Sequence, residues 1–252
     1  MKYDSRGLVI PVGLIVLAET GAWVTHLQSD SLAPPSAIAM AWLEALRDGS
    51  LLASTLQTLA CAMAGLSIGF GLGLALGVLI GLYRPLNYLL EVIIETIRPI
   101  PSVALIPIAL LVYGFGYRME ILIVAFATLW PALILSRAAV ANIEPRLIEV
   151  SRVLQLSLAA RIFKIAIPAA LPRIFVALRL SVGISLIVAV TVEVSSNTIG
   201  VGDRMMQASQ ALQPAIMLAY LVWVGVLGWI LSAAMSVAQR RMFGAAANLE
   251  GT

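Results

Sequence analysis

Residues 149–168 read EVSRVLQLSLAARIFKIAIP and form a polar, basic segment between long apolar stretches. Arg152, Arg161 and Lys164 lie within this segment, and Arg173 follows shortly after it. Packing between membrane helices does not require such an island of charge, because charged groups are costly within lipid. Docking of a soluble partner at the membrane surface does require one. The segment is therefore the strongest indication of function in this sequence.

The composition of the 252-residue chain is that of a helical membrane protein. Hydrophobic residues make up 61% of it and charged residues 12%, whereas soluble domains carry about 25% charged residues. The single cysteine, Cys61, excludes a disulfide framework, and the single histidine, His26, excludes the usual zinc clusters. The basic residues lie beside apolar segments, which argues against a nucleic-acid partner. We expect no metal site, no catalytic residue and no cofactor in this chain.

Six apolar segments are long enough to cross a bilayer. A span needs about 20 residues, and lipid forces the backbone groups to pair within a helix. The sequence predicts spans at residues 8–27, 51–82, 89–113, 119–140, 174–194 and 215–238. The first span resembles a signal peptide but has no convincing cleavage site, so we interpret it as uncleaved. We expect an all-α membrane protein with six transmembrane helices in one domain over residues 1–252.

The distribution of Lys and Arg predicts the orientation. If the N-terminus is cytoplasmic, thirteen of the 16 basic residues fall on or near the inner side, which is a strong positive-inside bias. The inner residues are Lys2, Arg6, Arg84, Arg98, Arg137, Arg146, Arg152, Arg161, Lys164, Arg173, Arg179, Arg240 and Arg241. The outer residues are Arg47, Arg118 and Arg204. Both termini are then cytoplasmic, and the polar loop, residues 141–172, is a long inner connection.

The second predicted span carries a ladder of glycines at Gly65, Gly69, Gly73, Gly77 and Gly81. Residues four apart share one helix face, and glycine allows another helix to approach closely in lipid. The ladder therefore predicts a helix-packing face. A face that slides during a conformational change is the second interpretation of the same pattern.

Prolines interrupt the third predicted span. Residues 97–107 read IRPIPSVALIP, in which Pro99 and Pro101 flank an isoleucine and follow Arg98. Proline removes a backbone donor and disturbs a helix. Either the prolines mark a helix start with Arg98 at the inner interface, or they open a gate or pathway element near the inner mouth. Glu193, near the outer end of the fifth span, is the other pathway candidate.

The polar loop predicts two short helices joined by a turn. Residues 142–145, NIEP, are typical of a helix start, because proline and glutamate suit the first turn. Ser157 is a good N-cap for a second helix at residues 158–165. We expect Pro168 and Pro172 to end that helix before the fifth span. The second helix then lies across the membrane axis.

The spacing in this loop resembles the integral membrane subunits of bacterial ABC importers. Their pattern is E-A-A, three residues, G, nine residues, I-x-L-P, and the matching residues here are Glu149, Ile165, Ile167 and Pro168. The segment PAALP at residues 168–172 resembles the sulfonate, taurine and nitrate branch. Further matches are Arg98-Pro99-Ile100-Pro101, Pro107, Phe115-Gly116, Leu178-Arg179, Glu193 and Gly200-Val201-Gly202.

This resemblance, which covers roughly residues 50–240, implies a permease subunit in the bacterial inner membrane. It implies a second permease subunit in a dimer, two cytoplasmic ATPases that bind ATP and Mg, and a periplasmic or lipid-anchored solute-binding protein. The expected solute is a small anion such as a sulfonate, nitrate, bicarbonate or carboxylate. The chain itself has no phosphate-binding loop, so we expect no ATP hydrolysis by it.

The resemblance also implies that the polar loop couples to the ATPase. The candidate coupling residues are Glu149, Ser151, Arg152, Gln155, Leu156, Ser157, Leu158 and Arg161. Val150 and Ser151 replace the two alanines of the family pattern, and Gln155 replaces its glycine. Glycine permits a left-handed turn, which glutamine adopts only at a cost. We therefore expect either a slightly different angle of the hairpin or a specialised fit to the ATPase.

Other classes of membrane protein fit the sequence less well. A secondary transporter driven by an ion gradient needs ionisable residues near the midplane, and the centres of the predicted spans are nearly free of them. An intramembrane enzyme would need a motif such as G-x-S-x-G or paired aspartates, and neither is present. Activity of the assembled complex distinguishes a permease from a purely structural subunit.

Overall fold

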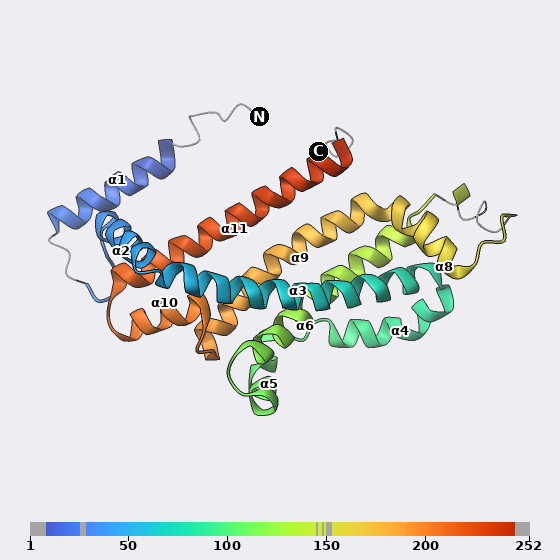
Figure 1. Cartoon of the computed structure of the whole chain (residues 1–252), viewed down its shortest axis with the longest axis horizontal. Helices are drawn as coiled ribbons and strands as arrows, with labels where there is room; N and C mark the ends of the chain where they lie inside the picture. The colour runs from blue at the N-terminus through green and yellow to red at the C-terminus, as the bar shows by residue number, and fades with distance from the viewer. Residues whose placement is uncertain (1–8, 26–28, 145, 148, 150–152, 245–252) are drawn as a thin grey trace. The chain divides into compact units, whose positions relative to one another are not determined.

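The computed structural model describes residues 9–25, 29–144, 146–147, 149 and 153–244, and these residues contain no strand. They form helices and short connections (Figure 1). The chain divides into two compact units. Unit 1 comprises Met1–Gln57 and Thr198–Leu227, and unit 2 comprises Thr58–Asn197 and Gly228–Thr252. The expectation of an all-α fold is confirmed for the described residues.

Unit 1 combines the beginning of the chain with a later segment that includes the first half of α11. Its elements are α1 (Val9–Val24), α2 (Pro35–Arg47), the start of α3 (Ser50–Leu82), α10 (Gly200–Gln210) and the first half of α11 (Pro214–Phe243). Helix α2 begins at Pro35, where a proline costs no hydrogen bond. The core of unit 1 forms around four buried residues, Ala45, Leu51, Val201 and Tyr220.

Polar contacts connect the helices of unit 1. The Glu19 carboxylate in apolar α1 accepts the Ser36 backbone N–H at 3.0 Å and the Ser36 hydroxyl at 2.7 Å. Glu19 thereby satisfies a donor at the positive N-terminal end of α2. Asp48 accepts the Ser50 backbone N–H at 2.8 Å, and this bond lowers the pKa of the Asp48 carboxyl. The Trp223 indole donates to Thr55 Oγ1 at 2.7 Å.

Unit 2 contains the larger helical bundle. Its elements are α4 (Arg84–Ile97), η2 (Ser102–Leu105), α5 (Ile106–Tyr113), α6 (Tyr117–Ala141), α8 (Leu158–Arg161), η3 (Ile162–Ala166), α9 (Ile167–Ser196) and the remaining parts of α3 and α11. The α3–α6–α9 bundle has one buried cluster that includes Val78, Val140 and Ala170. A second cluster, with Met119, Ile123 and Val192, lies at the opposite end of α6.

The glycine ladder of α3 packs directly on the backbone of α6. A Cβ built on Gly65 would lie 3.0 Å from the carbonyl oxygen of Ile121, one on Gly77 2.5 Å from that of Leu133, and one on Gly81 2.9 Å from that of Arg137. Gly69 and Gly73 face the carbonyls of Ala125 and Leu129 in the same way. Both series rise by four residues, so the two helices run parallel and in register over about five turns. Such close backbone contact also permits weak Cα–H···O bonds.

The described residues contain four helices long and apolar enough to cross a membrane. They are Ser50–Leu82, Tyr117–Ala141, Ile162–Gln210 and Pro214–Phe243. The pair Pro85–Ile97 and Ser102–Tyr113, bent by 79°, makes a fifth if the pair counts as one span. Helix α1 has 16 residues, fewer than the roughly 20 of a typical span. A multi-pass helical membrane fold follows, while the count of six spans stays a prediction.

The prediction that Pro168 and Pro172 end the second loop helix is wrong. Helical backbone continues from α8 through the π-helical turn η3 into α9 without a break. Pro168 lies in the first turn of α9, and Pro172 lies inside that helix. Pro168 falls where a helix tolerates proline, just after the π-helical turn. Pro172 removes one hydrogen bond, and the burial of Ala170 and Ile174 in a cluster with α3 and α6 residues holds the helix around it.

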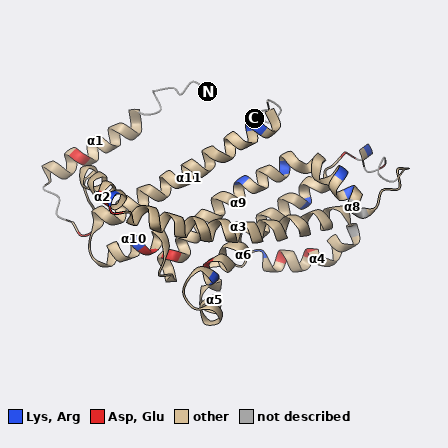
Figure 2. Ribbon diagram, in the orientation of Figure 1, with Lys and Arg blue, Asp and Glu red and all other residues tan. Residues whose placement is uncertain are grey.

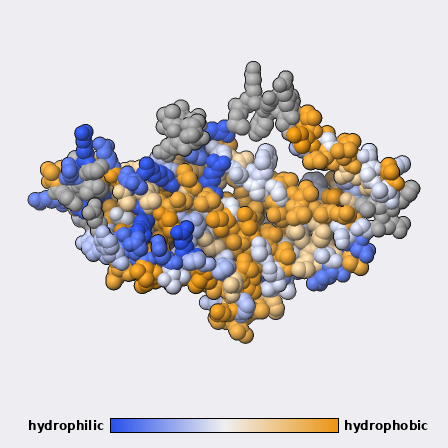
Figure 3. Space-filling view, turned by 180° about the vertical axis from the view of Figure 1, so that it is seen from behind, coloured by the Kyte–Doolittle hydropathy of each residue, from blue (hydrophilic) through white to orange (hydrophobic). Residues whose placement is uncertain are grey.

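The surface of unit 2 is apolar along the helices and basic at one end. In Figure 2, Lys and Arg gather on α8 and on the first half of α9. In Figure 3, hydrophobic surface covers the middle of the visible face and the projecting α5, whereas polar surface lies at the end of unit 2 that carries α8. This pattern fits a membrane-embedded body with a polar end in water.

Candidate functional site

The polar loop provides the first candidate site. Ser157 Oγ accepts the Ala160 backbone N–H at 3.3 Å, so the N-cap that the sequence predicts for the second loop helix is present. Ser151 and Arg152 lie outside the described residues, and the Leu158 side chain is not described. The hairpin as a whole therefore stays a prediction, while its second half is α8 and η3.

The turn before α8 is left-handed at Gln155. Its φ is +47°, in the region that favours glycine. The family pattern has glycine at this position. The backbone therefore adopts the turn that glycine favours, although the residue here is glutamine. The strain of a left-handed residue with a Cβ is roughly 1–2 kcal/mol.

Replacing Gln155 by glycine is expected to stabilise this turn by about 0.5–1 kcal/mol, because relief of the strain exceeds the entropic cost of glycine. Amide hydrogen exchange in the described residues 153–157 should slow about two- to fivefold. Leu154→Gly is the matched control, because Leu154 is an exposed neighbour with φ outside the left-handed region. Faster exchange in the Gln155→Gly variant would contradict the strain argument.

The loop exposes apolar side chains to solvent. Val153 is 82%, Leu154 62% and Phe163 70% exposed. Glu149 lies beside the first two and helps to line a surface hollow of about 480 Å³. Leu156 and Arg161 are half-buried. Sequence reasoning missed Phe163, although an aromatic residue in a basic segment is a typical interface signal.

The break in the third predicted span provides the second candidate site. Helix α4 ends at Ile97, and η2 begins at Ser102, so Arg98, Pro99 and Pro101 all lie in the connection. The axes on the two sides differ by 79°. The prolines therefore both separate two helices and turn the chain sharply.

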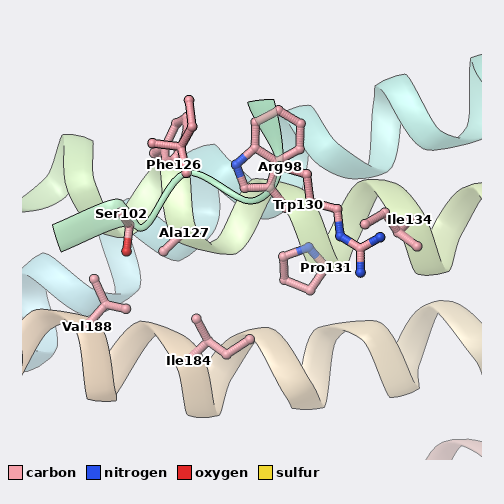
Figure 4. A pocket seen from close by; sticks show the side chains of 10 residues that line it. Arg98, Ser102, Phe126, Ala127, Trp130, Pro131, Ile134, Ile184 and Val188 are labelled. Carbon is pink, nitrogen blue, oxygen red and sulfur yellow. The ribbon is translucent and has the colours of Figure 1, made fainter. Parts of the chain in front are cut away.

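A cavity of about 310 Å³ opens beside this break, entirely within unit 2 (Figure 4). Arg98 lines it from the α4–η2 connection, Ser102 from the start of η2 and Trp130 from α6. Its apolar walls include Phe126 of α6 and Ile184 and Val188 of α9. Only Arg98 of these residues was a sequence candidate, because the others become neighbours only through packing between helices.

The polar side chains that line this cavity are Arg98, which is exposed, Ser102 and Trp130. The Trp130 indole nitrogen is buried and has no hydrogen-bond partner in the part of the chain that the structure describes. Arg98 forms no ion pair with any described residue. Glu91, one of the acidic residues of the adjoining α4, instead pairs with Arg137 at 3.0 Å.

The pathway candidate Glu193 lies elsewhere in unit 2. Glu193 is 1% exposed and lies in α9 among the polar residues of a buried cluster, whereas Arg98 lines the cavity. The same cluster holds Glu120, which is fully buried in the first turn of α6. Asn197 Nδ2 donates to Glu120 Oε2 at 2.7 Å, and Asn197 Oδ1 accepts the Gly116 backbone N–H at 2.8 Å. Sequence reasoning missed Glu120, which lies near the end of an apolar segment without a distinguishing motif.

Comparison with known proteins identifies the family. Residues 69–244 match the family model described as binding-protein-dependent transport system inner membrane component. The putative aliphatic sulfonates transport permease protein SsuC of Escherichia coli (strain K12) is 31% identical over 92% of this chain and 88% of its own. The bicarbonate transport system permease protein CmpB of Synechococcus elongatus is 30% identical over 77% of this chain and 70% of its own.

A solved structure supports the same fold. The structure of inward-facing conformations of the MetNI methionine ABC transporter in its CY5 native crystal form has a TM-score of 0.69 and 22% identity. The match covers 76% of this chain and 95% of that chain. The resemblance seen in the polar loop is thus confirmed at the level of the whole sequence. The chain belongs to the family of binding-protein-dependent transport system inner membrane components.

Proposed function

We propose that this chain is the permease subunit of an ATP-driven importer that admits a small anion delivered by a binding protein. The observation that carries the proposal is the exposed apolar set Val153, Leu154 and Phe163 on the basic loop. In a chain of this family, such side chains at the membrane surface fit a soluble partner, because water alone gives them no favourable contact. The loop and both termini are then cytoplasmic.

The proposed assembly contains two permease chains, two ATPases and a solute-binding protein. ATP and Mg bind to the ATPases. Residues 149–161 of the loop form the ATPase contact together with Phe163. The binding protein delivers the solute on the outer side. The solute is a small anion, as the names of the sulfonate and bicarbonate relatives suggest.

The continuity of the helices in unit 2 suggests how motion passes from the loop to the membrane. Helical backbone runs from Leu158 to Ser196 through α8, η3 and α9. The buried cluster that joins α9 to α3 and α6 includes Ala166 of η3. A displacement of the loop by the ATPase would therefore tilt α9 as a rod and shift the helices against which it packs. Rigid elements of this kind carry coupling between distant sites.

Phe163→Asp is expected to abolish ATP-dependent solute uptake in proteoliposomes that contain the complete complex, and to reduce co-purification of the ATPase at least tenfold. The reason is that a carboxylate replaces an apolar contact at the proposed interface. Phe115→Asp is the matched control, because Phe115 is also exposed, by 62%. Phe115 lies in the connection before α6, whereas the polar loop follows the other end of α6. Full uptake and normal co-purification of the ATPase with Phe163→Asp would contradict the proposal.

A transporter driven by an ion gradient is the alternative function. The buried carboxyls Glu120 and Glu193 lie near the first turn of α6 and the last turn of α9, at helix ends rather than at mid-helix. This placement does not favour an ion site at the centre of the bilayer. Uptake that requires ATP and persists when ionophores collapse all ion gradients would distinguish the importer from this alternative.

A further inference from the structure

We propose that the buried residues Glu120 and Glu193 form a site that binds one proton, which Glu193 carries and donates to Glu120. This proton joins the first turn of α6 to the last turn of α9 within unit 2. The site does not depend on the importer function, because it concerns how two helices of this chain are held together. Its basis is the burial of the pair, the donors that reach Glu120 and the charges around it.

The two carboxyls lie together where water does not reach them. Glu120 is 0% exposed and Glu193 1% exposed, and Glu193 is a neighbour of Glu120. Met119 and Val192, which adjoin the pair in the sequence, belong to one buried apolar cluster. Two negative charges side by side in such surroundings are strongly unfavourable, because burial removes the water that would screen them. At least one of the two carboxyls therefore holds a proton.

Glu120 receives a donor at only one of its two oxygens. Asn197 Nδ2 donates to Glu120 Oε2 at 2.7 Å, whereas Glu120 Oε1 is buried and has no hydrogen-bond partner in the described part of the chain. An ionised carboxylate is an acceptor only, so Glu193 cannot supply a donor without a proton. Protonated Glu193 supplies an O–H donor to Glu120, and charge-assisted hydrogen bonds of this kind are short and strong. One proton thus provides the partner that Glu120 Oε1 lacks.

The charged and titratable groups around Glu120 do not neutralise it. The ion pairs of the described residues involve other carboxylates. The titratable neighbours of Glu120 are Glu193 from α9 and the buried thiol of Cys61 from α3. Helix α5 contributes the apolar Ile106 to the adjoining cluster, and Arg118 at the start of α6 is exposed. A proton is therefore the positive charge that these surroundings leave for the pair.

The ends of the two helices decide which carboxyl carries the proton. Glu120 lies in the first turn of α6, where the partial positive charge of a helix N-terminus stabilises a carboxylate. Glu193 lies in the last turn of α9, where the partial negative charge of a helix C-terminus disfavours one. The Asn197 amide adds a second stabilising contact to Glu120. Glu193 is thus the protonated member of the pair and Glu120 the ionised one.

Loss of the proton replaces a hydrogen bond between α6 and α9 by repulsion between two carboxylates. The folded state holds a proton that an exposed glutamate releases above about pH 4.3, so stability should decrease as the pH rises. The proton should contribute a fall of about 3–5 °C per pH unit in the thermal unfolding midpoint between about pH 5.5 and about pH 8. Differential scanning fluorimetry of the full chain in mild detergent, over a series of buffers, measures this slope.

Glutamine variants identify the residue that carries the proton. Glu193→Gln places a permanent N–H donor beside Glu120, so the contribution to the slope should disappear. Glu120→Gln keeps an acceptor beside Glu193, which retains its proton, so the contribution should remain. Cys61→Ala and Glu95→Gln, at an exposed carboxyl of α4, are controls and should keep the parental slope.

Infrared spectroscopy of the same samples observes the proton directly, without thermal unfolding. At about pH 7 the parent protein should show the carbonyl stretching band of a protonated carboxyl, whereas exposed Asp and Glu are ionised at that pH. Glu193→Gln should remove the band, and Glu120→Gln should retain it.

Loss of both the band and the slope contribution in Glu193→Gln alone supports the site. Absence of the band from the parent protein, or an unchanged band in Glu193→Gln, would overturn the inference. Loss of the band in Glu120→Gln alone would also overturn it, because the proton would then belong to the other carboxyl. Stabilisation of the parent by sodium chloride at the upper end of the pH range, absent from Glu193→Gln, would assign a metal cation to the pair and overturn the inference as well.

Discussion

Replacing Gly73 by leucine is expected to abolish recovery of a folded, monodisperse protein. A Cβ at Gly73 would lie 2.7 Å from Ala132 Cβ and 3.0 Å from the Leu133 backbone nitrogen. Backbone atoms of α6 cannot move aside without separating the two helices over several turns. Overpacking typically costs about 1–3 kcal/mol, and a complete leucine side chain against backbone should exceed that range. Size-exclusion chromatography in mild detergent, with thermal unfolding of the recovered fraction, measures the loss.

Two positions on the same helix give matched controls for this substitution. A Cβ at Gly71 meets nothing within 4 Å, and Ala75 is exposed. Gly71→Leu and Ala75→Leu should therefore be recovered at near-parental yield. The yield of Gly73→Ala should lie between the yields of these two controls and that of Gly73→Leu. Equal yields for Gly73→Leu and Gly71→Leu would show that the ladder does not hold α3 against α6.

Replacing Asn197 by leucine is expected to destabilise the protein by about 3–5 kcal/mol. The change leaves the buried Glu120 carboxyl without its amide donor and the Gly116 N–H without its acceptor. Each buried polar group left without its hydrogen-bond partner costs about 1–3 kcal/mol, and two groups lose theirs here. For a chain of this length, the thermal unfolding midpoint should fall by on the order of 10 °C. Differential scanning fluorimetry in detergent measures the shift.

The hydrogen bond between Asn197 and Glu120 allows a test of the energetic coupling between these two residues. Glu120→Leu combined with Asn197→Leu should be less destabilised than the sum of the two single variants, because no buried carboxyl then lacks its amide partner. Asn142→Leu is the control, since Asn142 is exposed at the end of α6 and its amide donates to the carbonyl of Ala138. Its effect should remain below about 1 kcal/mol. Strict additivity in the double variant would contradict the role of the Asn197–Glu120 bond.

Features that depend on local chemistry could be predicted from the sequence. The cap at Ser157 and the interruption at Pro99 and Pro101 each follow from a few neighbouring residues. The left-handed turn at Gln155 was indicated by the glycine of the family pattern at that position. The regular spacing of the glycines likewise indicated a face rather than a single contact. The helix that they face, α6, could not be deduced, because the spacing carries no information about the partner.

Features that depend on packing between distant segments were missed. Trp130 lines a cavity only because α6 lies beside both the α4–η2 break and α9. Glu120 becomes a buried polar residue through Asn197, 77 positions later in the chain. The expected stop at Pro172 failed for a different reason, because Ala170 and Ile174 on either side of it are buried in a cluster with residues of α3 and α6, and this packing holds the helix. Local rules for proline do not include such compensation.

The residues of α6 beneath the ladder determine which turn of α6 meets which turn of α3. Because the glycines repeat every four residues, a screw displacement by four residues, about 6 Å, would bring nearly every glycine over an equivalent carbonyl. The backbones alone therefore define a set of similar alignments rather than one. The α6 side chains beneath the glycines run Val124, Thr128, Ala132, Ser136 and Val140. They are small at Ala132 and Ser136 and larger on both sides, so a slip of four residues in either direction presses Thr128 or Val140 into a space that fits alanine or serine. Thr128 and Val140 thus select one alignment from a repeating set.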